Sequence, residues 1–192
     1  LPPCCEVVIN NLNNEEIVAN RKIRIIISAL DLESKRKNSI WLLQCLNKIT
    51  TQTFKITLIG KTGNIINELI KNSPHTFYCS GQLNRNEALQ QMKTADIFLF
   101  ASLSDDWGYV ITEAMAKGLA VLVPNNHPFN FIVGTNDYCF ELNNEDSFKN
   151  KLLQLVNASN LTKAKQHSLN RAETLFSRKQ FAYNLKPLLV NL

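Results

Sequence analysis

The sequence lacks any hydrophobic run close to the ~20 residues that a membrane-spanning helix needs, so it predicts no transmembrane segment. Its opening residues, LPPCCEVV, have neither the basic start nor the long apolar core of a signal peptide. They also lack an initiating Met, and Pro2 and Pro3 lead straight into a strand-like run at residues 7–9. We therefore expect a fragment that begins at a domain boundary.

Motifs of several common enzyme classes are also missing. No G-x-G-x-x-G follows the first long apolar strand, which counts against a dehydrogenase, and there is no Walker A sequence. His75, His127 and His167 stand alone, so we interpret each as a structural or surface residue. No Ser-His-Asp or Cys-His arrangement is present. The residues alone therefore show no catalyst.

The five cysteines have no metal-ligand spacing, and their odd number fits a disulfide framework poorly. Cys45, Cys79 and Cys139 lie in apolar segments, which indicates buried free thiols in a reducing compartment. The sequence thus predicts neither a metal site nor a disulfide scaffold.

The composition that is present is typical of a folded domain. The chain has 192 residues, of which 45% are hydrophobic and 19% charged, enough for one domain with a normal core. Its net charge of +5 suits a phosphate-bearing ligand or an anionic membrane face. Because the basic residues are scattered and not interleaved with aromatic ones, we expect no nucleic-acid partner. We expect a cytoplasmic protein, and peripheral contact with the inner membrane face stays open.

Short apolar runs alternate with helix-like segments along the chain. Asn84 and Glu87 form a capping-box pattern, with Asn in place of Ser, at the start of one helix. The alternation predicts an α/β fold, a Rossmann-like doubly wound parallel sheet, followed from residue 144 by a helical C-terminal tail of two or three helices. The predicted strands are 7–9, 22–27, 54–59, 75–79, 95–100, 119–123 and 138–142, with helices over 40–49, over 63–70 and from 84.

Right-handed crossovers place every strand-to-helix loop at one edge of such a sheet. These loops begin near Ser28, Gly60, Ser80, Ala101 and Val123, so we expect them to converge on one crevice. Ligands of α/β proteins bind in such crevices.

Residues 102–118 carry two acids at this crevice, Asp105 on the loop and Glu113 about one turn inside the following helix. Glu113 either accepts hydrogen bonds from the vicinal diol of a ribose or pairs with Lys117 at i+4. Asp105 either faces a ligand or is a solvated loop acid. Gly108 either starts the helix or lets backbone N–H groups approach a phosphate. The residues alone leave these alternatives open.

Lys35, Arg36 and Lys37 form a basic cluster in the loop after strand 22–27. Such cations either neutralise a diphosphate at the rim of the crevice or form a solvated face. Together with Glu113, they predict a nucleotide-like ligand.

The segment DDWGYVITEAMAKG at residues 105–118 resembles the signature of retaining GT-B glycosyltransferases of glycosyltransferase family 4, the glycosyl transferases group 1. That signature reads Glu, a Gly-Phe-Gly-like turn, and a second Glu followed by Ala-Met-Ala-x-Gly. Further segments are similar to the family in the same order, so the resemblance covers nearly the whole chain. They are residues 8–11, 31–37, 58–60, 78–81 and 176–181.

The resemblance implies that residues 1–192 are one donor-binding domain, the C-terminal half of a GT-B enzyme whose N-terminal acceptor domain is absent from this chain. It implies a catalytic site in which Glu113 binds the donor ribose and Asp105, standing where the family has Glu, contacts the sugar hydroxyls. The other implied donor-site residues are Arg36 and Lys37 for the diphosphate charge, Gly108 and Tyr109 for its backbone contacts, Trp107 beside them, Gly60 at one strand end, and Gly81 and Leu83 near the base.

The implied reaction is retaining transfer of a hexose-type sugar from a UDP-, GDP- or ADP-sugar to a glycan or lipid-linked acceptor in polysaccharide or lipopolysaccharide biosynthesis. The site would stabilise the departing nucleoside diphosphate by electrostatics, with no metal or other cofactor. The fragment alone is expected to bind the nucleotide weakly and to turn over nothing.

Four departures from the family pattern leave other functions open. Asp105 is one methylene shorter than Glu, Asn38 replaces a Gly, residues 28–30 lack an Arg, and residues 130–133 lack an acid near Phe131. The alternatives are a non-catalytic nucleotide-sugar-binding or scaffold module of the same fold, and a GT-B-fold nucleotide-sugar epimerase.

Overall fold

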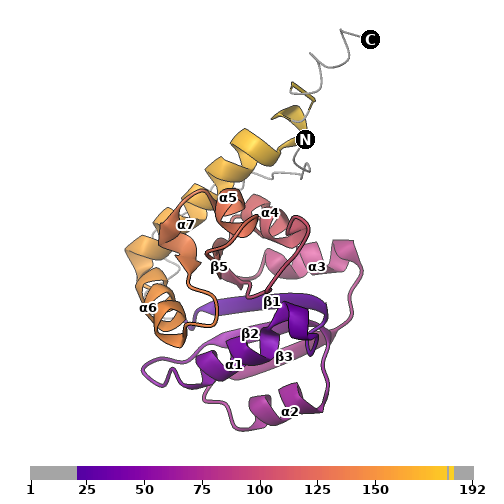
Figure 1. Cartoon of the computed structure of the whole chain (residues 1–192), viewed down its shortest axis with the longest axis vertical. Coiled ribbons are helices and arrows are strands. Elements are labelled where there is room, and N and C mark those ends of the chain that lie inside the picture. The colour runs from indigo at the N-terminus through magenta and orange to yellow at the C-terminus, as the bar shows by residue number, and fades with distance from the viewer. Residues whose placement is uncertain (1–20, 181, 184–192) are drawn as a thin grey trace.

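The computed structural model describes residues 21–180 and 182–183. At its centre lies a six-stranded sheet in the order β3-β2-β1-β4-β5-β6, and every neighbouring pair is parallel (Figure 1). This confirms the predicted Rossmann-like α/β fold; the predicted strand at 7–9 lies outside the described residues. The strands are β1 (Arg24–Asp31), β2 (Lys55–Lys61), β3 (Thr76–Gly81), β4 (Ile97–Leu99), β5 (Ala120–Pro124) and β6 (Cys139–Phe140).

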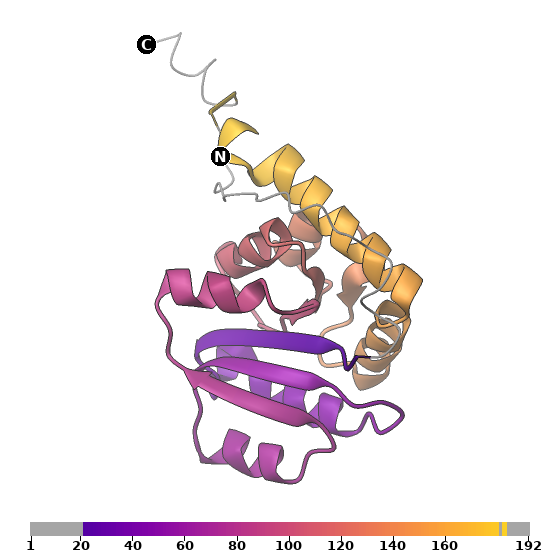
Figure 2. The same ribbon diagram turned by 180° about the vertical axis from the view of Figure 1, so that it is seen from behind.

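Helices cover both faces of the sheet because successive side chains of a strand point to opposite faces. Ile25 and Ile27 of β1 join the core on one face, whereas Ile26 joins the core on the other. The two helical layers are visible from opposite sides in Figures 1 and 2. The first face packs against α1 (Ser39–Asn47), α2 (Asn64–Lys71) and α6 (Glu145–Leu155), and the second against α3 (Arg85–Met92), α4 (Tyr109–Ala116) and α5 (Phe129–Val133).

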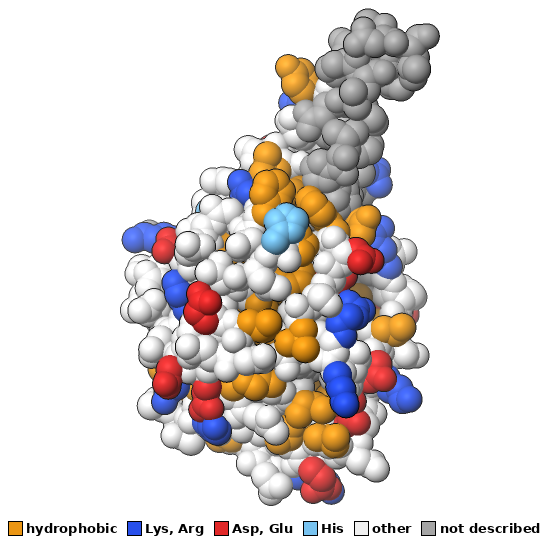
Figure 3. All heavy atoms as spheres, viewed as in Figure 1, with side chains coloured by type: hydrophobic (Ala, Val, Ile, Leu, Met, Phe, Trp, Pro, Cys, Tyr) orange, Lys and Arg blue, Asp and Glu red, His pale blue; other side chains and the backbone are white. Residues whose placement is uncertain are grey.

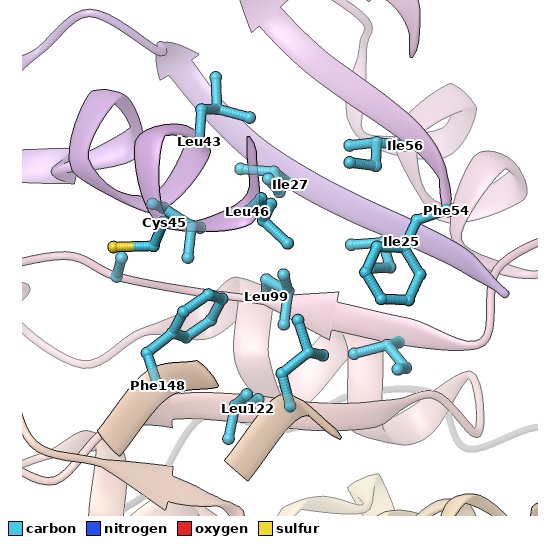
Figure 4. Close-up of a cluster of buried hydrophobic side chains, with 14 of the residues drawn as sticks. Ile25, Ile27, Leu43, Cys45, Leu46, Phe54, Ile56, Leu99, Leu122 and Phe148 are labelled. Carbon is cyan, nitrogen blue, oxygen red and sulfur yellow. The ribbon is translucent and has the colours of Figure 1, made fainter. Parts of the chain in front are cut away.

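The core of the first face is built almost entirely from aliphatic and phenyl side chains (Figure 4). Leu46 of α1 and Phe148 of α6 pack over Ile25, Leu99 and Leu122 of three neighbouring strands, and none of the five is more than 1% exposed. Burying each such side chain contributes roughly 1.5–3 kcal/mol. This layer holds the strand ends, and therefore the loops that follow them, in place.

The C-terminal tail is helical, as predicted. After α6 come α7 (Ala158–Arg171) and a π-helical turn over Ala172–Phe176, and α7 is seen along its length in Figure 2. The side chains of Asn144 and Asn157 cap α6 and α7 by accepting N–H groups from the first turns. None of the helices in residues 21–180 is both long and apolar enough to span a membrane.

Two segments differ from the sequence prediction. Residues 130–133, which lie outside the predicted strands and helices, belong to the short helix α5, because Phe129, Ile132 and Val133 bury one helical face and Gly134 ends the helix at φ +77°. Strand β6 covers only two residues of the predicted 138–142, because Tyr138 lies in a 3-10 turn and the Glu141 N–H donates to the Ser147 hydroxyl.

The cysteine prediction is correct for two of three positions. Cys45 and Cys139 are buried free thiols, and burial raises their pKa values to about 11 and about 12. The prediction for Cys79 is wrong, since its side chain is exposed. It lies on β3, an edge strand whose side chains are largely uncovered.

Candidate functional site

The strand order reverses between β1 and β4. The chain runs outward from β1 to β3 and then returns to place β4 on the other side of β1. Residues 32–38 follow β1 and residues 100–108 follow β4, so both loops leave the sheet at this reversal. Ligands of doubly wound sheets bind in the crevice at such a point. The predicted site residues Arg36, Lys37 and Asp105 lie on these two loops.

Asp105 joins the two loops through an ion pair. The Lys37 Nζ to Asp105 Oδ2 distance is 2.6 Å, and Arg36 Nη1 lies 3.4 Å from the same oxygen. The side chains of Lys37 and Asp105 are only 18% and 23% exposed. The structure thus brings together residues that the family resemblance assigned separately to the diphosphate and to the sugar.

The charges of this cluster fix the protonation state of Asp105. Partial burial raises the pKa of Asp105, but the hydrogen bond and charge of Lys37, with the charge of Arg36, outweigh burial and lower the pKa below its usual value. The carboxylate is therefore ionised at neutral pH and balances part of the positive charge beside it.

Backbone contacts clamp the two loops independently of this ion pair. The Arg36 carbonyl accepts hydrogen bonds from the Leu103 N–H at 2.8 Å and from the Ser102 hydroxyl at 3.0 Å. Ser102 is fully buried, and the Arg36 guanidinium donates to the Ser104 carbonyl at 3.0 Å. The two loops are therefore held together at the backbone of Arg36, next to the cations.

Helix α4 begins at the end of the second loop, directly after Gly108. Gly108 has φ +83°, and an added Cβ would lie 3.0 Å from Ile111 Cδ1 and 3.4 Å from Phe129 Cδ1, so backbone and packing by themselves require glycine. No side chain caps this helix, and the first N–H groups of α4 suit an anion. The side chain of Tyr109 is exposed beside them. Both interpretations of Gly108 therefore fit the structure.

Glu113, on α4, is paired with Arg85, the first residue of α3. The Arg85 Nε to Glu113 Oε1 distance is 2.6 Å, and the Glu113 side chain is only 17% exposed. Among the described residues, Lys117 forms no ion pair with Glu113, which removes the i+4 pairing as an alternative role of Glu113. The ribose role of Glu113 stays a prediction.

The other predicted donor-site residues have different surroundings. Gly60 has φ +131°, and a Cβ there would lie 1.7 Å from the Ala29 carbonyl oxygen, so the close approach of β2 to β1 requires glycine. Leu83 packs against the core of the second face. Gly81, by contrast, ends β3 with open space around it. Packing accounts for Gly60 and for part of the Leu83 side chain, and Gly81 has space beside it for a ligand.

Aromatic and aliphatic side chains surround the same loops. The indole of Trp107 meets the half-exposed ring of Phe131 edge-on at 6.1 Å between centroids, and its buried Nε1 has no hydrogen-bond partner among the described residues. Leu103 is also exposed on this part of the chain. Figure 3 shows hydrophobic side chains in a broken band down one face, with charged side chains on both flanks. Apolar surface next to a few polar groups is typical of ligand crevices.

Two residues of this site, Arg85 and Ser102, were not expected from the sequence. The capping box at Asn84 and Glu87 is confirmed, with backbone-to-side-chain distances of 2.9 and 3.0 Å. It makes Arg85 the first residue of a helix that opens at the crevice edge, which could have drawn attention to it. Nothing in the sequence marks Ser102 as buried.

The sequence model of the family described as Glycosyl transferases group 1 matches residues 21–158. The chain belongs to this family. The predicted resemblance to the C-terminal domain of GT-B glycosyltransferases is thereby confirmed. A search of curated proteins found no match to the sequence.

Solved glycosyltransferases share the fold of this group 1 chain. A glycosyltransferase from Rickettsia africae ESF-5 aligns with a TM-score of 0.70 and 18% identity over 87% of this chain and 47% of its own. The pneumococcal O-GlcNAc transferase GtfA, solved with UDP and GlcNAc, aligns with a TM-score of 0.67 and 22% identity over 88% of this chain and 35% of its own. The catalytic domain of cholesterol-α-glucosyltransferase from Helicobacter pylori aligns with a TM-score of 0.65 and 18% identity over 80% of this chain and 99% of its own. The chain thus spans less than half of the first two proteins and nearly all of the third.

Proposed function

We propose that this group 1 glycosyltransferase chain binds a nucleotide-sugar donor and, with an acceptor domain outside residues 1–192, transfers a hexose-type sugar with retention of configuration. The observation that carries the proposal is the placement of two loops at the strand-order reversal: Arg36 and Lys37 lie on one loop, and the helix carrying Glu113 begins at the end of the other. A nucleoside diphosphate offers the matching groups, two phosphates and a ribose diol. The pneumococcal relative solved with UDP supports this ligand class.

In the proposed reaction, the bond between the sugar C1 and the diphosphate oxygen breaks, and the departing nucleoside diphosphate keeps the electron pair. Lys37, Arg36 and the first N–H groups of α4, at Tyr109, would stabilise the charge that develops on that oxygen. The acceptor hydroxyl oxygen bonds to C1 on the same face, and its proton passes to the departing diphosphate oxygen. Asp105 would contact the sugar hydroxyls, Glu113 the ribose, and Gly81 the base.

We propose a glycan or lipid-linked acceptor in polysaccharide or lipopolysaccharide biosynthesis, and a cytoplasmic location with peripheral contact to the inner membrane face. The net charge of +5 supports attraction to an anionic membrane surface.

Binding of UDP, GDP and ADP sugars, followed by amide chemical shifts of the 192-residue chain, tests the donor proposal. We expect shifts around Lys37 and Glu113 with one of the three, and a roughly tenfold weaker affinity in Glu113→Gln, because a charged hydrogen-bond acceptor is lost. Glu68→Gln is the matched control, since Glu68 also forms a side-chain ion pair, with Lys71, but lies on the exposed surface of α2. No response at Lys37 or Glu113 with any donor would overturn the proposal.

The complete protein distinguishes the remaining functions. Sugar transfer that disappears in Glu113→Gln supports the transferase, donor binding without transfer supports a binding or scaffold module, and a changed sugar without added acceptor supports an epimerase.

A further inference from the structure

We infer that Asp105 competes with the anionic ligand of this site for the same cations. Its carboxylate forms ion pairs with Arg36 and Lys37 until phosphate groups displace it. The inference rests on the proposed function in one respect, since it takes the ligand of these cations to be phosphate-bearing. It adds a role that neither the family nor the fold assigns to this position.

The geometry leaves Lys37 little room for a second anion, whereas the Arg36 side chain is half exposed. Asp105 Oδ2 lies 2.6 Å from Lys37 Nζ, a distance at which a phosphate oxygen would bind, and 3.4 Å from Arg36 Nη1. The Lys37 side chain is mostly buried, and its Nζ lies 5.8 Å from the centroid of the Phe100 ring. A phosphate that reaches Lys37 must therefore take the place of the carboxylate.

The same contacts show that the carboxylate can leave without dismantling the site. Apart from these cations, Asp105 accepts only the Asp106 N–H, at 3.0 Å, among the hydrogen bonds of the described residues. The links that clamp the loops run from Ser102 and Leu103 to the Arg36 carbonyl and do not involve the Asp105 side chain. Rotation of one side chain would therefore free the cations, and the displaced carboxylate could then reach the sugar.

Inorganic pyrophosphate is the probe, because it carries the diphosphate charge without base, ribose or sugar. Its affinity is measured calorimetrically at low ionic strength for the 192-residue chain and for Asp105→Asn. We expect Asp105→Asn to bind pyrophosphate about twofold to fivefold more tightly, which is the range set by a partly exposed ion pair. Asp106→Asn is the matched control: it removes the same charge one residue away, and Asp106 forms no ion pair in the described residues.

An unchanged or weaker affinity in Asp105→Asn would overturn the inference, as would an equal gain in Asp106→Asn, which would indicate a general field effect. A tighter pyrophosphate complex in Asp105→Asn, with no binding of UDP, GDP or ADP by any variant, would support the competitor and overturn the nucleotide proposal.

If Asp105→Asn fails to fold, as judged by circular dichroism, the unaltered chain provides a second test. The carboxylate carbon of Asp105 should shift in NMR spectra as pyrophosphate is added. A response at Lys37 without one at Asp105 would overturn the inference.

Discussion

Strand β4 has an aspartate beyond each of its ends, and the two are held very differently. Asp96 directly precedes β4, is 1% exposed, and binds Arg21 at 2.6 and 2.7 Å and Lys165 at 2.8 Å. It also accepts the Arg24 N–H at 2.9 Å. Asp105, in the loop after β4, is 23% exposed, and its cations come from a single turn.

The comparison shows how burial and the number of partners separate a structural ion pair from an exchangeable one. Both oxygens of Asp96 are saturated by donors from the chain before β1, from β1 and from α7, so releasing it would leave buried charges unpaired. One oxygen of Asp105 faces the cations, and water or a ligand can replace it there. We therefore expect Asp96 to determine stability and Asp105 to determine ligand affinity.

The largest expected effect is the loss of stability in Asp96→Asn. The amide keeps the size of the carboxylate but leaves Arg21 and Lys165 facing a neutral group, so we expect the free energy of unfolding to fall by about 3–5 kcal/mol. Denaturant unfolding measures this. Asp106→Asn, at an exposed acid, should change it by less than about 0.5 kcal/mol. A loss below about 1 kcal/mol for Asp96→Asn would remove the distinction between the two aspartates.

The next largest expected effect is a loss of stability at low pH, where Asp96 becomes protonated. Burial raises the pKa of Asp96, but Arg21 and Lys165 outweigh it and lower the pKa from 3.8 to about 2. Because the folded-state pKa is the lower one, this stabilisation is complete above pH ~3.8 and is lost as the pH falls towards ~2, a change of about 2 kcal/mol. The free energies of unfolding of Asp96→Asn and of the unaltered chain should therefore converge as the pH falls. Parallel curves between pH ~4 and ~2 would contradict the assignment.

Two lysine substitutions should give the smallest effects and separate the clusters most clearly. Lys37→Gln should weaken pyrophosphate binding about tenfold while changing stability by less than about 1 kcal/mol, because its ion pair is partly exposed. Lys165→Gln should destabilise the fold and leave pyrophosphate affinity unchanged, because Lys165 serves Asp96 at the opposite end of β4. Calorimetry and denaturant unfolding of both variants measure this. Loss of ligand affinity in Lys165→Gln would show that the two clusters are coupled.

Much of the fold could be predicted from the sequence because its signals are local. Runs such as residues 22–27 are long and β-branched, and the capping box at Asn84 lies within four consecutive residues. Local sequence signals failed to predict the segments whose structure depends on tertiary contacts. The register shift near Ser28 and Asp31 extends β1 beyond its apolar run, and α5 forms because Phe129 and Ile132 find the second core.

The site was less predictable, because its contacts join residues far apart in the chain. Lys37 and Asp105 are 68 positions apart, and Arg85 and Glu113 are 28 apart. The loops could be placed at one edge from topology, but which cation meets which acid depends on side-chain reach. Asp96 drew no attention for the same reason, since Arg21 lies 75 positions away.

The uncovered edge strand β3 favours association between two copies of the chain. Its sequence, TFYCSG, carries no charged side chain, and an edge strand presents unpaired backbone donors and acceptors to any second chain. Pro74, just before the strand, protects only the beginning of β3 from pairing with a second chain. At high concentration, two copies would pair along this edge with the exposed Cys79 thiols at the contact. An added two-electron oxidant would then take up the two thiol hydrogens and join the sulfurs in a disulfide, which makes the dimer covalent.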